Sequence, residues 1–340
     1  MSPQFVDFDA DGQLDIVAGI FDGSPHLVRG SQAGWGKPEQ ILDREGQRIV
    51  LNAFWNFDTK KWDKTDRCNG KGYEAGEGHI TSAVAFDVDG DGDLDLLLGD
   101  HRSGRVFVRR NEGSATKPAF ATTNEILLAD GKPIDVPGTV ATLRLVDWNH
   151  DGRQDLACGG MGDAYSDGPG GGVVLFLNTG TDKAAAFGAP ITLLEVSKKG
   201  QAEPTRPDSG LYMDFGDHDG DGDLDMVVGG YSHWSPKPVE LTEAQKARVA
   251  ELKTLIDGVN KRTHELMQTI EDAVKGLDED AAAKKRDELW NAKQDAFGVI
   301  SKERQTLQKE LEPLQPGMKR ESYVWLYENK GAKEASAGRK

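Results

Sequence analysis

Short apolar runs recur along the first two thirds of the chain, and each is followed by a glycine. The runs occupy residues 16–18, 96–98, 156–158 and 226–228. Runs this short, bounded by glycine, are typical of buried strands rather than helices. Further strands are predicted downstream at residues 105–108, 173–177 and 323–327, with fourth strands at residues 126–128 and 191–194. Short strands in a repeated order predict an all-β fold.

A nine-residue acidic motif precedes each apolar run. The four copies read DFDADGQLD from Asp7, DVDGDGDLD from Asp87, DWNHDGRQD from Asp147 and DHDGDGDLD from Asp217. Acidic or amide side chains fill positions 1, 3, 5 and 9, and glycine fills position 6, where the chain reverses sharply. Because calcium takes roughly six to eight oxygen ligands, this spacing predicts about four Ca²⁺ sites.

The predicted ligands are the side chains at positions 1, 3, 5 and 9 together with the backbone carbonyl of position 7. They are Asp7, Asp9, Asp11, Gln13 and Asp15; Asp87, Asp89, Asp91, Asp93 and Asp95; Asp147, Asn149, Asp151, Arg153 and Asp155; and Asp217, Asp219, Asp221, Asp223 and Asp225. An EF-hand is excluded, because position 12 is never Glu and strands, not helices, flank the loops. An acidic turn without metal is the remaining alternative.

The charge balance agrees with metal loops. The chain carries 57 Asp and Glu against 41 Lys and Arg, a net charge of -16. The Asp residues of the four loops account for a charge of similar size, and clustered carboxylates repel one another unless a cation neutralises them. The acidic balance also argues against a nucleic acid as partner.

The loops and their strands together resemble the FG-GAP/VCBS repeats of integrin-α-like β-propellers. The resemblance rests on the acidic loop, the following DLLLGD or DMVVGG strand, and the later VVLFLNTG or VWLYENKG strand. It implies an all-β propeller of four-stranded blades with a calcium loop between the first two strands of each blade. Such propellers usually have seven blades. The four loops here leave two expectations: an N-terminal part is missing, or four or five blades close alone.

A long segment of different composition interrupts the last repeat and predicts an antiparallel helical hairpin. Thr242 and Gln245 form a capping box, and Gly276 and Asp278 separate two helices. The predicted seam follows coiled-coil spacing through Val249, Leu252, Ile256, Val259, Thr263, Leu266, Ile270, Ala273 and Leu277, then Trp290, Phe297, Ile300, Leu307, Leu311 and Leu314. The favoured interpretation is an antiparallel hairpin that decorates a propeller loop. The alternative is a dimerisation or docking arm that allows self-association.

The domain boundaries follow from these patterns. Residues 1–239 are predicted to form propeller blades, residues 240–316 the helical hairpin, residues 317–331 the final propeller strand, and residues 332–340 a disordered tail.

The loops between the second and third strands of each repeat are the candidate ligand-binding loops. Strands in a blade alternate in direction, so these loops gather on the face opposite the calcium loops, where ligands of such folds commonly bind. The candidates are His26, Asp100, His101, Arg102, Asp163, Tyr165, Tyr231, His233 and Trp234. A separate aromatic group, Phe54, Trp55, Phe57 and Trp62, suits sugar stacking or, as the favoured interpretation, packing against the blades.

The predicted cellular compartment and the two cysteines do not point to a further functional site. No apolar run is long enough for a membrane span and no export signal follows Met1, yet calcium loops suit extracellular or periplasmic calcium levels. We therefore expect that the protein is exported with a leader that is absent from this sequence. Cys68 and Cys158 are too few for a disulfide framework; Cys158 is expected in a buried strand, and Cys68 is either free or paired.

Function is predicted at the level of class. No nucleophile elbow, phosphate loop or metalloprotease motif is present, so no catalytic residue is assigned. The expected function is a non-catalytic binding, adhesion or scaffold module for a protein or glycan outside the cytoplasm. The alternative is a carbohydrate-active enzyme, such as a polysaccharide lyase, that uses His101, Arg102, Tyr165 and His233.

Overall fold

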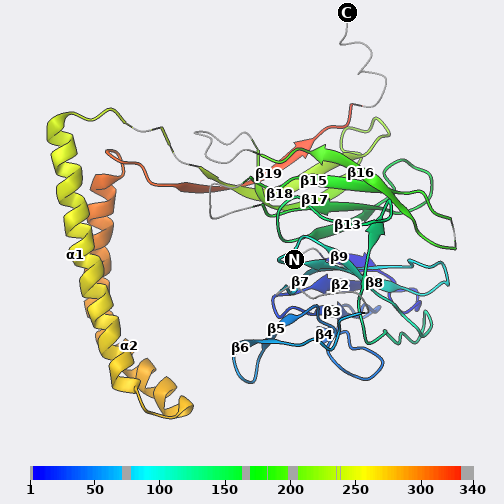
Figure 1. Cartoon of the computed structure of the whole chain (residues 1–340), viewed down its shortest axis with the longest axis horizontal. Helices are drawn as coiled ribbons and strands as arrows, with labels where there is room; N and C mark the ends of the chain where they lie inside the picture. Colours follow the sequence, from blue (N-terminus) through cyan, green and yellow to red (C-terminus); the bar gives the residue numbers. More distant parts are fainter. Residues whose placement is uncertain are drawn as a thin grey trace, which may run out of the picture. The chain divides into compact units, whose positions relative to one another are not determined.

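The computed structural model describes residues 3–70, 78–162, 169–181, 183–197, 206–234, 236–237 and 239–330. The fold is mostly β, with several sheets and two long helices (Figure 1). The chain divides into two compact units: Met1–Trp234 together with Arg320–Lys340, and Ser235–Lys319. The tail predicted at residues 332–340 lies outside the described residues.

The β unit contains four main sheets in chain order. The first sheet holds β1 (Gln4–Val6), β2 (Asp15–Gly19), β3 (Pro25–Val28) and β4 (Glu39–Gln40), and the second holds β7 (Ile80–Phe86), β8 (Asp95–Asp100), β9 (Val106–Arg109) and β10 (Glu125–Ile126). The third holds β13 (Thr142–Val146), β14 (Asp155–Gly159), β15 (Val173–Asn178) and β16 (Phe187–Leu194), extended by β11 (Leu128–Ala129) and β12 (Lys132–Pro133). The fourth holds β17 (Ser209–Gly216), β18 (Asp225–Trp234) and β19 (Lys319–Tyr327). A separate hairpin pairs β5 (Ala53–Asn56) with β6 (Lys61–Lys64).

Each acidic loop joins the first two strands of one main sheet. The strands on either side pair antiparallel, and the Asp at position 9 begins the second strand: Asp15 lies opposite Val6, and Asp95 opposite Phe86. Asp155 and Asp225 occupy the same register in the third and fourth sheets. The predicted strand–loop–strand repeat is therefore present in every main sheet.

The sheets stack in chain order because the strands carry apolar side chains on both faces. Successive side chains of a strand point to opposite faces. Val17 of the first sheet packs in one buried cluster with Leu96 and Leu98 of the second sheet. On the opposite face of the second sheet, Leu97 packs in another cluster with Leu156 of the third sheet. Residues of the third and fourth sheets form the next cluster, so three buried layers separate four successive sheets (Figure 1).

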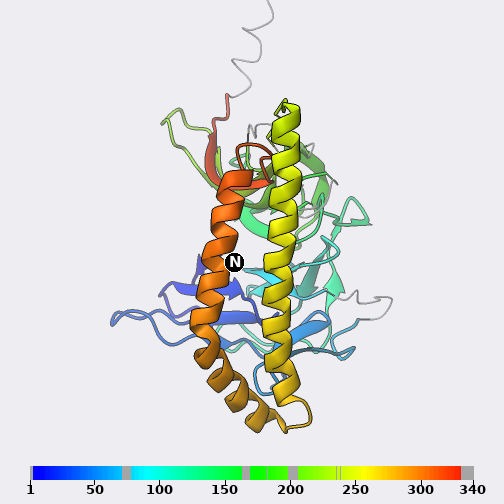
Figure 2. The same cartoon turned by 90° about the vertical axis from the view of Figure 1, so that its left-hand side faces the viewer.

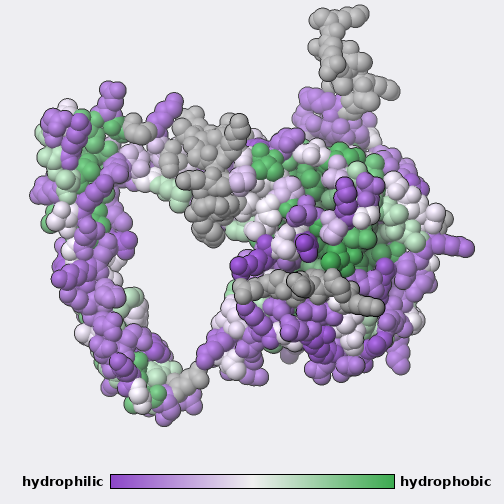
Figure 3. Space-filling view, in the orientation of Figure 1, coloured by the Kyte–Doolittle hydropathy of each residue, from purple (hydrophilic) through white to green (hydrophobic). Residues whose placement is uncertain are grey.

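The second unit is an antiparallel pair of helices, α1 (Glu243–Val274) and α2 (Glu279–Leu311), which lie side by side in Figures 1 and 2. Thr242 and Gln245 form the predicted capping box. Ion pairs of Arg248 with Glu310 and Arg262 with Glu303 join the helices. Hydrophilic residues cover much of the visible hairpin surface (Figure 3).

The hairpin seam differs from the predicted one at three positions, the first of which is Leu277, which is exposed. Val274 is buried where Ala273 was expected, and Trp290 is exposed and stacks on Phe297 with ring centroids 4.6 Å apart. A straight helix has about 3.6 residues per turn, so a strict seven-residue pattern drifts off the seam over successive turns. Leu252, Val259 and Ile270 are buried as expected.

Candidate metal centres and ligand-binding loops

The Asp at position 1 folds each acidic loop around itself. In the first loop, the backbone N–H groups of Asp11 and Gly12 donate to the two carboxylate oxygens of Asp7, each at 3.0 Å. Asp87, Asp147 and Asp217 also accept two backbone hydrogen bonds each; position 6 always donates one, and the other comes from position 5 in the third loop and from position 4 in the second and fourth loops. Gly12 has a φ of 85°, a conformation that glycine adopts without strain. The sequence pattern thus encodes the loop shape directly.

The Asp at position 9 fastens each loop to the third strand of its sheet. Asp155 is fully buried, and its two oxygens accept the backbone N–H of Trp148 at 3.0 Å and of Asn178 at 2.7 Å. The same pair of bonds recurs at Asp15 from Phe8 and Gly30, at Asp95 from Val88 and Asn111, and at Asp225 from His218 and Asn329. The sequence predicted only a metal ligand at this position and missed the fastening role.

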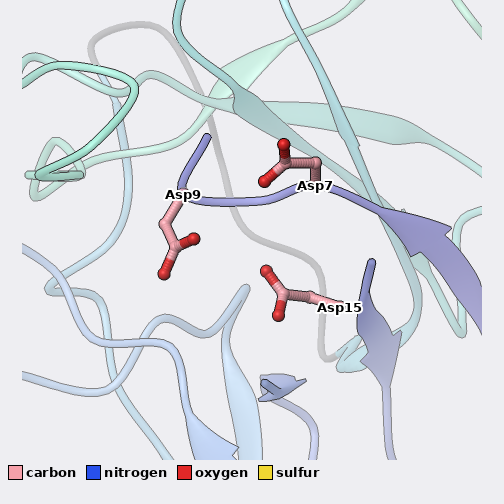
Figure 4. Close-up of side chains that lie close together, drawn as sticks. All are labelled: Asp7, Asp9 and Asp15. Carbon is pink, nitrogen blue, oxygen red and sulfur yellow. The ribbon is translucent and has the colours of Figure 1, made fainter. Parts of the chain in front are cut away.

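Carboxylate groups converge in three of the loops. Ligand atoms lie within 4.8 Å of one another in the groups Asp7, Asp9 and Asp15; Asp87, Asp89 and Asp91; and Asp217, Asp219 and Asp225. Figure 4 shows the first group, whose carboxylates surround a common space. One buried oxygen each of Asp9, Asp93 and Asp223 has no hydrogen-bond partner within the described part of the chain. The converging carboxylates fit a hard divalent cation, and in the first loop Asp9 belongs to both sets.

The electrostatics of the second loop also favour a bound cation. Burial, together with the neighbouring carboxylates of Asp91 and Asp95, raises the pKa of Asp93 to about 6. Both effects disfavour a negative charge that nothing compensates, and a bound cation would remove the penalty.

Arginine side chains make the loops unequal. Arg29 binds Asp9 in the first loop, and Arg110 lies 3.1 Å from Asp95 in the second. In the third loop, Arg153 lies 2.5 Å from Asp151. In the fourth sheet, Glu328 follows the third strand at the place where Arg29 and Arg110 stand in theirs. The fourth loop thus has five Asp residues and no arginine at this place in the chain, and Glu328 pairs with Lys330 at 3.6 Å.

An aromatic cluster joins the β5–β6 hairpin to the candidate ligand-binding loops of the first two sheets. We define it as Phe21, Trp55, Trp62, His79 and His101. His101 stacks on His79 with ring centroids 4.2 Å apart, and His79 contacts Trp62 at 4.6 Å. Phe21 contacts both tryptophans and is 66% exposed. The cluster thus presents aromatic surface to solvent.

Burial sets the charge state of the cluster. Burial, together with the adjacent His101, lowers the pKa of His79 to about 4. The pKa of His101 is also lowered, mainly by burial. Both imidazoles are therefore neutral near pH 7.

The sequence found this cluster only in part. It placed Trp55 and Trp62 in a group apart from the ligand-binding loops, whereas the structure joins them to Phe21 and His101. Phe54 instead lies under the guanidinium of Arg48. His79 was missed, because a single histidine before a strand carries no motif; only the fold places it between Trp62 and His101.

Two predicted ligand-binding residues hold their own loops. His26 lies 3.1 Å from the buried Asp22, which also accepts hydrogen bonds from Ser24 and Arg48. Burial alone would raise the pKa of Asp22, but hydrogen bonds, led by that from His26, bring it to about 2. The buried Asp100 accepts the backbone N–H groups of residues 102 and 103.

Two further candidates, Tyr231 and His233, form a second group in the fourth sheet. Tyr231 packs edge-on against His233 with ring centroids 5.3 Å apart, and the guanidinium of Arg320 lies 3.9 Å from the centre of the Tyr231 ring. Asp163 and Tyr165 lie outside the described residues. Among the described contacts, none joins this group to the aromatic cluster.

Both cysteines are buried free thiols. Burial raises the pKa of Cys158, in keeping with an unreactive core residue. The sequence left open whether Cys68 is free or paired, and in the structure it is a free thiol. Within the described ranges, neither helix is long and apolar enough to cross a membrane.

The fold and loops define a β-sheet repeat protein with acidic loops. Residues 87–158 match the family model of the FG-GAP-like repeat. The chain is 26% identical over 267 residues to integrin alpha-PS2 of Drosophila melanogaster, covering 73% of this chain and 17% of that protein. The resemblance to FG-GAP repeats is thus confirmed, and the chain spans less than a fifth of this curated relative.

Among solved structures, the chain was matched to an α-L-arabinofuranosidase from Clostridium thermocellum. The TM-score is 0.35 at 11% sequence identity, and the likeness covers 67% of this chain and 60% of that one.

Proposed function

We propose that this chain is a calcium-stabilised, propeller-like binding module that acts outside the cytoplasm. The convergence of carboxylate oxygens in three of the acidic loops carries the calcium part of the proposal. The FG-GAP-like match and the sheets that stack in chain order support the propeller-like part. Extracellular or periplasmic calcium levels suit exposed loops of this kind.

Calcium would be held by side-chain oxygens at positions 1, 3, 5 and 9 of each loop, with the backbone carbonyl of position 7. Bound there, it would neutralise carboxylates that otherwise repel one another. Because the ion binds the folded loops and not the unfolded chain, it stabilises the fold by mass action.

Chelation tests the calcium part. Melting in EDTA is expected several degrees below melting in millimolar calcium, since about 100-fold excess over Kd contributes about 2.7 kcal/mol. Magnesium, which demands smaller octahedral sites, is expected to restore less of the loss. Identical melting curves in EDTA and calcium would contradict the proposal.

The ligand of the module is proposed to be a protein or a glycan that contacts the aromatic cluster. Exposed aromatic rings such as Phe21 and Trp62 offer apolar faces on which sugar rings or apolar side chains can stack. The neutral state of His79 and His101 keeps charge off this surface. The distant relation to an integrin α chain supports a binding role.

Binding to panels of immobilised glycans and extracellular proteins tests this part. Phe21→Ala is expected to weaken binding to any hit by tenfold or more, and Val299→Ala, an exposed site on the helical hairpin, is the control. Equal affinity of both variants would remove the aromatic cluster as the binding site. Release of shortened sugars from a bound polysaccharide would favour the enzyme alternative instead.

A further inference from the structure

The imidazoles of His79 and His101 form a stack inside the aromatic cluster. Their ring centroids lie 4.2 Å apart, and the angle between their planes is 19°. The partly buried His79 also contacts Trp62, with ring centroids 4.6 Å apart. Trp62 in turn packs against Phe21 and Trp55. The two histidines therefore support the rings that the proposed ligand contacts.

The outer ring of the stack belongs to His101, which is exposed to solvent. Its backbone is held on both sides: its N–H donates to the carbonyl of His79, and its carbonyl accepts the N–H of Val140, each at 2.9 Å. Rotation about the first side-chain bond would still carry the ring into water. His79 has less room, because a Cβ added to Gly23 would lie 3.1 Å from the Cβ of His79. His101 is thus the movable member of the stack.

The charged groups around the stack do not stabilise a protonated ring. Asp100 raises the pKa of both histidines, but burial outweighs it. Both oxygens of Asp100 also accept hydrogen bonds from residues 102 and 103. Arg102 acts against a second positive charge on His101.

The other elements that pack around the stack carry few further charges. They are Asp22, which pairs with His26 and Arg48; Asp63, which accepts a hydrogen bond from Asn56; and Lys61 and Lys64 of β6. The segment at residues 137–141, which contacts the backbone of His101, has no charged side chain. Among the described contacts, no carboxylate bonds to either ring of the stack.

His26, in the neighbouring loop, has the opposite setting. Its ring lies 3.1 Å from the carboxylate of the buried Asp22, so a proton there would strengthen an existing contact. A proton on His79 or His101 instead enters a stack of two imidazoles. Burial penalises one positive charge in this place, and two charges at this spacing repel each other. The stack is therefore stable in its neutral form and strained in its protonated form.

Protonation and opening of the stack are consequently coupled. The pKa of His79 is about 4 in the stack, against 6.5 for an ordinary histidine. A proton binds more tightly once His101 has turned away and water reaches His79. At about pH 5, this difference favours the open form by up to about thirtyfold relative to neutral pH.

We propose that the His79–His101 stack is a pH-dependent switch for ligand binding at the aromatic cluster. With both rings neutral, the stack holds Trp62 and Phe21 in the arrangement that binds the ligand. A proton on the stack turns His101 outward, removes support from Trp62 and releases the ligand. This inference rests on the proposed ligand-binding function of the cluster and adds its regulation: binding at neutral pH and release in an acidic environment.

Fluorine NMR of the full chain, labelled with 5-fluorotryptophan and saturated with calcium, tests the switch without a ligand. The chain has 7 tryptophans, and Trp62→Phe identifies the signal beside the stack. Between about pH 7.5 and about pH 5, the Trp62 signal is expected to move, because the packing around His79 changes. The signal of Trp290, on α2, is the internal reference. A Trp62 signal that stays fixed in the wild-type chain would overturn the proposal.

A double variant, His79→Phe with His101→Phe, keeps two rings at these positions but takes up no proton. Its Trp62 signal is expected to stay fixed over the same pH range. His264→Phe, at an exposed position of α1, should retain the wild-type response. All these variants keep Asp93, whose pKa is about 6, so any contribution of the calcium loops is common to them. A wild-type response in the double variant would refute the switch.

The calcium-dependent melt at neutral pH checks that the double variant folds. If it does not fold, His101→Gln replaces it, because this substitution removes the outer ring at an exposed position. The Trp62 signal of His101→Gln is expected near its acidic position already at neutral pH. A signal at the neutral wild-type position would contradict the role of His101.

Ligand release is measured on the glycan or extracellular protein that the panels identify. From about pH 7.5 to about pH 5, affinity is expected to fall at least about fivefold for the wild type and to stay within about twofold for the double variant. Equal wild-type affinity at both pH values would overturn the switch. A panel without hits at neutral pH would count against the proposed ligand-binding function alone, because the fluorine titration needs no ligand and still decides whether the stack opens.

Discussion

At the scale of single residues, the acidic loops contain two kinds of aspartate. Asp7 and Asp155 both accept a pair of backbone hydrogen bonds, but Asp7 shapes the loop itself while Asp155 joins its loop to a different strand. The second role needs no metal, because backbone amides supply the positive ends of the dipoles. Buried aspartates at position 9 therefore stabilise the sheets whether or not a cation is bound in the loop.

Asp155→Asn is expected to lower the free energy of unfolding by about 1–3 kcal/mol. An amide has one acceptor oxygen where the carboxylate has two, so one of the buried N–H groups of Trp148 and Asn178 loses its acceptor. Urea denaturation measures the loss, which should persist in EDTA. Asp257→Asn on the exposed surface of α1 is the control, and an equally small effect for both would refute the fastening role.

His79 makes stability depend on pH. Its folded-state pKa of about 4 lies below the ordinary value of 6.5, so the unfolded chain binds more protons between these values. The free energy of unfolding is therefore expected to fall as the pH drops from about 6.5 to about 4. His79→Gln should flatten this dependence, and His264→Gln, on the exposed helix surface, should leave it unchanged.

At the scale of elements, four loops of nearly equal sequence differ in their surroundings. Arg153 supplies a positive charge inside the third loop, whereas the fourth sheet has Glu328, not an arginine, at the place directly after its third strand. A cation already provided by the protein reduces the attraction for a metal ion. The fourth loop should therefore bind calcium most strongly and the third loop most weakly.

Matched substitutions at position 5 test this ranking. Asp221→Asn is expected to reduce the calcium-induced rise in Tm clearly, equivalent to about 1 kcal/mol or more, because a roughly tenfold loss of affinity corresponds to 1.4 kcal/mol. Asp151→Asn should change the rise little, since Arg153 already pairs with that carboxylate. The reverse order in melts with and without EDTA would disprove the ranking.

At the scale of the whole molecule, the chain forms two compact units with cores of different depth. The β unit buries three apolar layers between its sheets. The helical hairpin buries four residues in the described part of its helices, all of them on α1. A narrow seam of this kind leaves the hairpin the less stable unit.

Leu252→Ala is expected to destabilise the hairpin by about 2–5 kcal/mol, because it empties a fully buried position. The helical signal at 222 nm should then melt at lower temperature while the calcium-dependent transition of the β unit stays in place. Leu255→Ala, on the exposed surface of α1, is the control. A shift of both transitions together would show that the units unfold as one.

The sequence by itself determined the features that depend on neighbouring residues. Position 1 and the glycine at position 6 lie within one turn of each other, so the loop shape could be read from the acidic motif. The strands beside each loop and the Thr242–Gln245 capping box are equally local. Local hydrogen bonds and side-chain periodicity act over a few residues, and a linear pattern records them.

Only the tertiary structure decided which distant residues meet. It placed His79 between Trp62 and His101, and gave the third loop its link from Asp155 to Asn178. It also distinguished Val227 from Val17, which the repeat pattern makes equivalent. Burial and pairing of this kind depend on which sheet lies alongside, and the packing of whole sheets is a property of the folded chain that no short stretch of sequence contains.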